Sequence, residues 1–334
     1  MAVLFAFMVP GFALKKLKML GEGATLTLSN ILLYVCQPAL VIKAFCIFSE
    51  EDAEIIYGIG TGKLLANFGV TAAISFIAMF LVFGISKLVF IKMKNKKAAN
   101  VYSFVAVFSN CGFLGIPFVE MFTDGNPLAV MYMMVFNVGF NILCWTLGIV
   151  LLTGSFKEIR LKKLALNPAI LTILIGLLLF FVPQINIFSI KGLEVIRMFP
   201  QYLAYMTAPV SMLIVGIRVA ETPLKQLFCK KGVYAAGALR LIVAPFLTFA
   251  VAIPFYFLLT EVRGALSLID EYIFLAPVIA MAMSPAASVV AMAERFDGDR
   301  EEATAAFVAN TIISVIIIPL VIMAVMACWG ALAG

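Results

Sequence analysis

The chain alternates between long apolar runs and short polar loops. We expect ten apolar segments, near residues 1–14, 28–48, 61–90, 100–122, 127–153, 167–184, 195–219, 232–259, 271–294 and 302–329. A helix needs about 20 apolar residues to cross a hydrocarbon core of about 30 Å, and only the first segment is clearly shorter. The pattern predicts an all-α polytopic membrane protein with ten transmembrane helices.

One of these runs contains residues that a simple span does not need. SNCGFLGIP, at 109–117, combines a polar Asn110 with Gly112, Gly115 and Pro117. Glycine is a poor helix former, and proline cannot donate a backbone hydrogen bond. The helix is therefore either kinked or broken here.

The composition agrees with a membrane protein. Hydrophobic residues make up 64% of the chain and charged residues 13%, with a mean hydropathy of +1.11. A soluble domain is typically about 45–50% apolar and 25% charged. No long polar segment marks a separate soluble domain, and the N-terminus has no signal-peptide pattern. The six cysteines show no CxxC spacing, which predicts neither a metal site nor a disulfide framework.

Basic residues mark one side of the predicted bundle. Most of the 24 Lys and Arg residues lie in the loops after segments one, three, five, seven and nine, whereas the alternate loops are acidic or neutral, as in SEEDAE at 49–54. This asymmetry follows the positive-inside rule and accounts for the net charge without a nucleic-acid partner. We expect a multi-pass protein of the cytoplasmic membrane with both termini outside.

The two halves of the chain repeat each other. LLYVCQPALVI (32–42) aligns with LAYMTAPVSML (203–213), and SNCGFLGIPFVEMF (109–122) aligns with SPAASVVAMAERF (284–296). Each half has five segments, an odd number, so the halves enter the membrane in opposite directions. Inverted repeats are common in secondary transporters, whose substrates bind at discontinuous helices. We therefore expect broken, crossing helices four and nine. The expected helix-breaking residues are Gly115 and Pro117 in the fourth segment, Pro38 in the second and Pro209 in the seventh.

Four stretches resemble the auxin efflux carrier family: YVCQPAL (34–40), NCGFLGIP (110–117), APVSMLIVGIRVA (208–220) and SPAASVVAMAERF (284–296). That family includes plant auxin exporters and bacterial permeases assigned to malonate, malate and similar carboxylates. The resemblance covers essentially the whole chain. The short stretch between the halves makes the chain similar to the bacterial type.

The resemblance implies a fold similar to that of bile acid:sodium symporters. It divides the chain into a first five-helix repeat (1–153), a cytoplasmic connector (154–166) and a second, inverted repeat (167–334). Helices 1, 2, 6 and 7 would form a scaffold, and helices 3–5 and 8–10 would form a transport domain. It also implies that Asn110 holds a substrate carboxylate. The chain departs from the family at Ser109, where plant members have proline, and at Ser288, near which bacterial relatives often have asparagine.

A broken helix leaves N–H groups and a positive dipole end at the start of its second half, which favours an anion. The expected substrate-binding residues are Ser109, Asn110, Cys111, Gly112, Ser284, Pro285, Ala286, Ser288, Asn137, Asn141 and Asn310. Packing between helices remains an alternative role for each of the asparagines.

Charged residues inside spans are rare and informative. Lys43 and Arg240 are candidate charge partners of the anion, although either could instead extend to the membrane surface. No acidic residue lies in the middle of a segment and the chain has no histidine, so we expect no proton coupling through a side chain that titrates near neutral pH.

We therefore expect a secondary transporter of a small organic anion, working by an elevator-type alternating-access mechanism. A channel, a receptor and a sodium-coupled bile-acid-type symporter remain alternatives. No motif of an intramembrane enzyme is present. We expect no cofactor, although carbonyls released at the breaks leave Na⁺ open as a coupling ion. The lipid bilayer is an expected partner, and a homodimer stays open.

Overall fold

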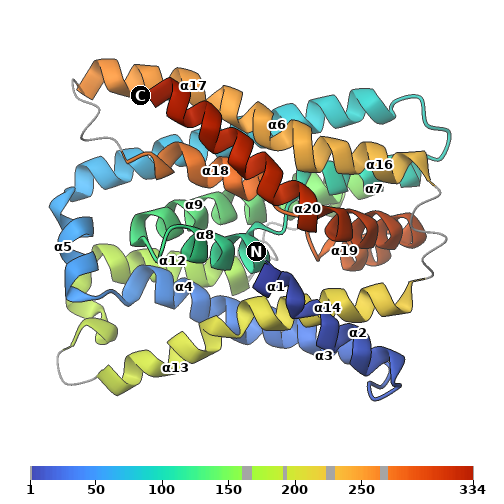
Figure 1. The fold of residues 1–334 in the computed structure, drawn as a ribbon, viewed down its shortest axis with the longest axis horizontal. Helices are drawn as coiled ribbons and strands as arrows, with labels where there is room; N and C mark the ends of the chain where they lie inside the picture. Colours follow the sequence, from blue (N-terminus) through green and yellow to red (C-terminus); the bar gives the residue numbers. More distant parts are fainter. Residues whose placement is uncertain (1, 160–167, 191–193, 223–229, 264–269, 334) are drawn as a thin grey trace.

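The computed structural model describes residues 2–159, 168–190, 194–222, 230–263 and 270–333 (Figure 1). Most of the expected connector at 154–166 lies outside the described residues. So do several of the basic residues that were used to predict the orientation, namely Arg160, Lys162, Lys163 and Lys225.

The described chain is built from helices. The first half contains α1 (Ala2–Ala6), α2 (Met8–Lys16), α3 (Ala24–Ile31), η1 (Leu32–Cys36), α4 (Gln37–Cys46), α5 (Glu50–Gly58), α6 (Thr61–Phe90), α7 (Lys96–Val107), η2 (Cys111–Gly115), α8 (Ile116–Phe122), α9 (Pro127–Cys144), α10 (Leu147–Thr153) and η3 (Phe156–Glu158). The second half contains α12 (Pro168–Phe181), η4 (Pro183–Ile185), η5 (Ile187–Ser189), α13 (Glu194–Tyr205), α14 (Thr207–Glu221), α16 (Lys231–Ala238), η6 (Leu239–Val243), α17 (Ala244–Arg263), α18 (Tyr272–Ala282), α19 (Val289–Arg295) and α20 (Arg300–Ala333).

Within the described residues, six helical stretches are long and apolar enough to cross a membrane: Ala24–Cys46, Thr61–Phe90, Pro127–Thr153, Val195–Glu221, Lys231–Thr260 and Arg300–Leu332. Shorter apolar helices cover Cys111–Phe122, Ile170–Phe181 and Tyr272–Ala282. The prediction of an all-helical protein with membrane-type spans is therefore confirmed.

Local sequence explains where several helices begin. Asn126 caps α9, because its Oδ1 accepts hydrogen bonds from the amides of Leu128 and Ala129 at 3.0 and 3.2 Å. Pro127, which has no N–H to leave unpaired, follows as the first helical residue. Ser49 and Asp52 form a reciprocal capping box at the start of α5.

The helices form two groups (Figure 1). In one group α14 packs against α2 and α3, and α4 packs against α12 and α13. In the other, α6 contacts α7, α9 and α17, while α20 contacts α7, α16 and α19. Contacts of α4 and α12 with α9, and of α14 with η2, join the two groups.

In the part of the chain that the structure describes, three helices contain a π-helical turn, and each turn is followed by a proline. Pro38 follows η1, Pro117 follows η2 and Pro245 follows η6. Proline removes a backbone donor and its ring clashes with the preceding turn, and a wider turn accommodates both effects. The expected break at Pro38 is therefore absent, since the chain stays helical from Ala24 to Cys46. The interruption near Pro209 lies just before it, between α13 and α14.

Two helices are interrupted by extended backbone rather than by a kink. The first gap separates α7 from η2, and the second separates α18 from α19. SNCGFLGIP therefore belongs to a broken helix. The break itself lies at 108–110, before the Gly115 and Pro117 that were expected to cause it.

Candidate functional site: the crossing of two broken helices

The two breaks pair with each other through their backbones. The amide of Asn110 donates to the carbonyl of Ser284 at 2.7 Å, and the amide of Ala286 donates to the carbonyl of Phe108 at 2.9 Å. These bonds form a short antiparallel bridge between Ser109 and Pro285, the only isolated bridge in the described chain. We call this region, residues 108–111 and 283–288, the crossing.

Asn110 lies at the crossing with a free amide group. Its side chain is 3% exposed, and its Nδ2 has no hydrogen-bond partner in the described structure. Its own carbonyl accepts from the amides of Leu114 and Gly115, both at 3.1 Å, so it begins the second half of the helix without a side-chain cap. A buried unpaired donor at a helix N-terminus is costly unless a ligand or water satisfies it.

A hydrogen-bonded chain connects the crossing to α9. Asn141 Nδ2 donates to Asn137 Oδ1 at 3.3 Å, and Cys111 Sγ donates to the same oxygen at 3.6 Å. Gly112 makes this approach possible, because a Cβ at that position would lie 3.0 Å from Asn137 Oδ1. Asn137 Nδ2 is also buried without a partner. The structure thus brings these two asparagines to the crossing.

A cavity of about 280 Å³ adjoins the crossing between the two groups of helices. It is lined by Thr25, Ser29, Leu32, Leu33, Tyr34, Phe113, Asn141, Trp145, Ser211, Ile214, Arg218, Ala287, Ser288, Ala291, Met292, Arg295 and Phe307. Among these lining residues, the charged ones are Arg218 and Arg295. We call this space the crossing cavity. Its lining is apolar with hydroxyl, amide and guanidinium groups, which suits an anion with an apolar body.

Arg240 is completely buried behind the crossing. Its Nη1 donates to the carbonyls of Ala106 and Val107 at 3.0 and 2.8 Å, and its Nη2 donates to the carbonyl of Met281. The side chain is 0% exposed, so it does not extend to the membrane surface.

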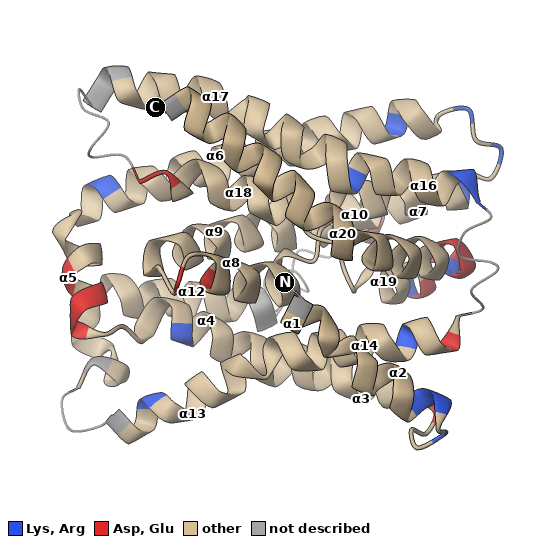
Figure 2. Ribbon diagram, in the orientation of Figure 1, with Lys and Arg blue, Asp and Glu red and all other residues tan. Residues whose placement is uncertain are grey.

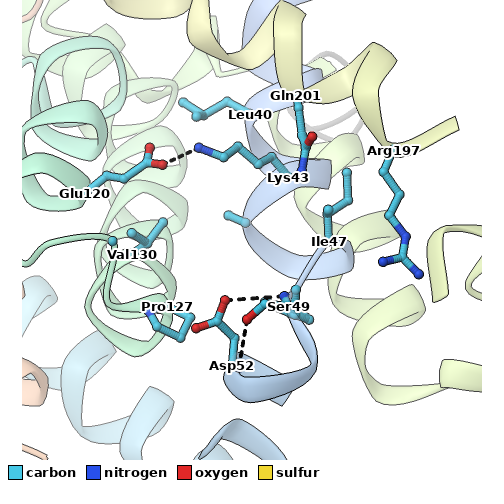
Figure 3. A pocket seen from close by; sticks show the side chains of 13 residues that line it. Leu40, Lys43, Ile47, Ser49, Asp52, Glu120, Pro127, Val130, Arg197 and Gln201 are labelled. Carbon is cyan, nitrogen blue, oxygen red and sulfur yellow. Dashed lines mark hydrogen bonds and ion pairs between the residues drawn. The ribbon is translucent and has the colours of Figure 1, made fainter. Parts of the chain in front are cut away.

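Lys43 lies at a second cavity, of about 400 Å³ (Figure 3). Figure 3 shows Lys43 of α4 and Glu120 of α8 pointing toward each other and forming an ion pair. The ammonium group also lies 4.2 Å from the ring centroid of Tyr205. This cavity is lined by Leu40, Lys43, Ala44, Ile47, Phe48, Ser49, Asp52, Glu120, Gly125, Pro127, Val130, Arg197 and Gln201, and none of these belongs to the crossing.

Asn310 lies away from the crossing cavity. Its Nδ2 donates to the carbonyl of Val233 at 3.1 Å, which joins α20 to α16. Gly237 allows the close approach, because a Cβ there would lie 2.0 Å from Asn310 Oδ1. Ser284, Pro285 and Ala286 form the second side of the crossing, and Ala287 and Ser288, which follow them, line the cavity.

Sequence reasoning missed Ser211, Arg218 and Arg295 as lining residues. All three lie in stretches that carry the family resemblance: Ser211 and Arg218 in APVSMLIVGIRVA, and Arg295 in SPAASVVAMAERF. Ser211 and Arg218 lie on α14, which contacts η2 next to the crossing. The sequence does not show that contact, so it could not show that these residues line the same cavity as Ser288.

Lysine and arginine residues concentrate at one end of the bundle, where α2 and α14 end and α7 and α16 begin (Figure 2). Several are paired with acids there, as in Lys15–Glu221 at 2.8 Å and Lys230–Glu302 at 2.8 Å. The crossing cavity is lined by Arg218 and Arg295 of this basic end. The Lys43 cavity is lined by Ser49 and Asp52 at the start of α5, and α5 lies at the opposite end of the bundle (Figure 1).

Apolar spans of membrane length around a polar crossing of two broken helices define a multi-pass membrane protein of the transporter class. A model of the membrane transport protein family matches residues 1–162 and again residues 153–322. The chain belongs to this family, and the resemblance to auxin efflux carriers is confirmed. No curated protein sequence gives a significant match to the chain.

Proposed function

We propose that the protein is a secondary transporter that moves a small organic anion across the cytoplasmic membrane. The observation that carries this proposal is the crossing cavity, in which two arginines and several polar groups meet a pair of broken helices. A helix N-terminus favours an anion, and the effect is stronger where water is excluded. Asn110 and Asn137 provide unpaired buried donors beside the cavity.

The size and chemistry of the cavity favour a small mono- or dicarboxylate, such as malonate or malate, or an auxin-like acid. Ligand cavities are commonly about 300–1,000 Å³, and the crossing cavity of about 280 Å³ is slightly smaller than this range, which favours a small ligand. A carboxylate would face the donors of the crossing, and the apolar wall with Phe113 and Trp145 would contact the rest of the molecule.

We also propose that the fold is a ten-helix inverted repeat. The two successive family matches support it. Contacts between equivalent positions support it as well, because positions related by a two-fold axis meet where they lie close to that axis. Cys36 and Thr207, which align in the repeat, are joined by a 3.5 Å hydrogen bond, and Ser284, which aligns with Ser109, pairs with Asn110.

In this proposal α2, α3–α4, α12 and α13–α14 form the scaffold, and the remaining spans form the transport domain. An elevator movement would slide the crossing along the scaffold, so that the anion is exposed alternately on each side. The basic end would face the cytoplasm, with the termini of the chain outside. In this proposal the anion would reach the crossing cavity from the cytoplasm, because the cavity is lined by Arg218 and Arg295 of the basic end.

Substrate-dependent flux in liposomes distinguishes this proposal from its alternatives. Saturable uptake of one of the candidate acids supports a carrier, and an ohmic current instead supports a channel. Binding without flux supports a receptor. Uptake that requires a sodium gradient supports a sodium-coupled symporter of the bile-acid type.

Replacement of Asn110 provides the sharpest test of the anion site. Asn110→Ala removes a donor that has no protein partner, so the melting temperature without substrate should change little. A hydrogen bond to a charged group is worth about 1.5–3 kcal/mol, so affinity for the acid should fall roughly 10- to 150-fold. Asn110→Asp places a negative charge beside the substrate and should abolish transport.

Thr248→Val is a matched control, because Thr248 is buried in α17 and bonds only to its own helix, at the carbonyl of Ala244. It should leave acid affinity unchanged. An Asn110→Ala protein that melts early yet binds its acid normally would show that Asn110 only joins helices. Affinity is measured by titrating the purified protein with the acid, and stability by thermal unfolding in detergent.

A further inference from the structure

The first halves of the two broken helices end at the same buried point. α7 ends at Val107 and α18 ends at Ala282, and both ends abut the crossing. The last four carbonyls of a helix have no intrahelical partner, and each helix end carries about half a negative charge. Two such ends together present roughly one negative charge at a buried point.

Arg240 binds both of these ends. Its guanidinium donates to Ala106 and Val107 of α7 and to Met281 of α18, so one cation holds carbonyls from both helices. All the acceptors in its described hydrogen bonds belong to backbone carbonyls or to the sulfur of Met281. An uncompensated charge at 0% exposure would be very costly, so the helix ends are its counter-charge.

The sequence places Arg240 here through a distortion of its own helix. It lies in the π turn η6, which precedes Pro245. π turns inside α-helices are frequently found at functional sites. In transporters with discontinuous helices, the C-terminal ends of half-helices and unwound carbonyls commonly coordinate the coupling cation. The guanidinium of Arg240 occupies a position of that kind.

We infer that Arg240 is a tethered cation that replaces a dissociable coupling cation at the crossing. It neutralises the carbonyl ends of α7 and α18 and keeps Asn110 and the second half-helix in position for the anion. It is therefore a positioning residue that contacts the helix ends rather than the substrate. This inference rests on the proposed anion site, and it implies that neither folding of the crossing nor binding of the acid requires Na⁺.

The first experiment needs no substrate. Thermal unfolding of the wild-type protein is compared in sodium chloride and choline chloride at equal ionic strength, and the melting temperatures should be the same. Arg240→Ala exposes the vacated carbonyls to small cations, so it should melt lower and be stabilised by low concentrations of guanidinium or Na⁺ relative to choline. A specific Na⁺ stabilisation of the wild type would overturn the inference.

The second experiment measures acid affinity with malonate, malate and indole-3-acetate as probes. Wild-type affinity should be independent of Na⁺. Arg240→Ala should bind about 10-fold or more weakly, because the uncompensated negative helix ends would repel the anion and the crossing would lose its position. Added guanidinium should recover part of this affinity, and Arg240→Lys should retain part of it. Thr248→Val, on the same continuous helix, should match the wild type in both salts.

The outcomes separate the two proposals. If the wild type binds an acid only in the presence of Na⁺, the anion site stands and the tethered cation is wrong. If Arg240→Ala melts early but binds its acid with wild-type affinity in choline, Arg240 is only structural and the inference is also wrong. If no probe acid binds in any salt, the proposed function fails. The inference about Arg240 is then decided by the melting temperatures in sodium chloride and choline chloride. Should the Arg240 variants not fold, the wild-type measurements still decide it.

Discussion

Single ionisable side chains influence stability outside the spans as well as inside them. Asp270 precedes α18, and its Oδ1 accepts a hydrogen bond from the amide of Tyr272 at 3.0 Å. Burial raises the pKa of this carboxyl from its ordinary 3.8 to about 6, although the Tyr272 amide acts in the opposite direction. The folded protein therefore holds the proton more tightly than the unfolded chain does. Its stability falls as the pH rises from 3.8 to about 6 and stays lower above that range.

Asp270→Asn keeps the acceptor oxygen and removes the charge. We expect it to stabilise the protein by about 1–3 kcal/mol at neutral pH, and the gain should vanish below about pH 4, where both proteins are neutral at this position. Thermal unfolding across this pH range measures the difference. Asp124→Asn is the control: Asp124 is exposed and has a φ of 50°, which asparagine tolerates. A pH-independent effect of Asp270→Asn would contradict the prediction.

Some residues of the candidate site could be predicted from the sequence, and others could not. Asn110 could be found because a polar residue among glycines and a proline is unusual in an apolar span. The three carbonyls that Arg240 binds could not be found, because their availability depends on where α7 and α18 end. The sequence pattern also could not predict where the helix breaks. Glycine and proline suggested a break at Gly115 and Pro117, but these residues lie in a π turn and in the helix that follows it.

At the level of helices, α2 and α14 approach so closely that their backbones touch. A Cβ at Gly216 would lie 2.0 Å from the carbonyl oxygen of Met8, and one at Gly11 would lie 2.2 Å from that of Leu213. Small residues at such contacts are typical of helix pairs in membranes. The atoms that an added Cβ would meet belong to the backbone, which cannot move aside as a flexible side chain can.

We therefore expect Gly216→Ala to separate the two helices and to lower the stability by about 1–3 kcal/mol or more. Gly84→Ala in α6 is the matched control, because a Cβ there meets nothing within 4 Å. It should be neutral or stabilise the protein by up to about 1 kcal/mol. Thermal unfolding in detergent compares the two, and equal melting temperatures would show that the contact does not limit the packing.

The helix boundaries were largely predictable, since the span expected at 61–90 coincides with α6 and that at 127–153 with α9 and α10. The length of the apolar run determines the bounds of both of these spans. The π turns were not predicted, although each precedes a proline, because proline in an apolar run permits a kink, a break or a wider turn. Which of these forms depends on the neighbouring helices.

Considered as a whole, the described chain consists of two groups of helices, and a polar contact is among those that join them. Lys43 on α4 and Glu120 on α8 form such a contact, on the side of the crossing away from the crossing cavity. Both side chains are largely removed from water, at 15% and 31% exposure. In the proposed transport cycle this ion pair must break when the groups slide.

Charge exchange tests this contact. Lys43→Glu and Glu120→Lys should each lower the melting temperature, and the double variant should recover most of the loss, with a coupling energy of about 0.5–3 kcal/mol. Recovery should be incomplete because position 43 also loses its cation–π contact with Tyr205. The same exchange at Lys97 and Asp297, which are 57% and 90% exposed, should couple by less than about 1 kcal/mol. Additive losses at 43 and 120 would show that the pair does not join the two groups.

The positive charge of the Arg240 guanidinium would make the proposed transport cycle depend on the membrane voltage. Under the proposed elevator movement Arg240 travels with its helices, and the helix dipoles that stabilise it carry no net charge of their own. The guanidinium and a bound monocarboxylate would therefore move together without net charge, whereas the guanidinium of the empty carrier would return as one positive charge. Moving one elementary charge across the membrane is worth about 2.3 kcal/mol per 100 mV. A negative interior would then draw the empty carrier back toward the cytoplasm and leave the loaded step almost unaffected. Voltage alone would favour export of the acid and would slow its uptake.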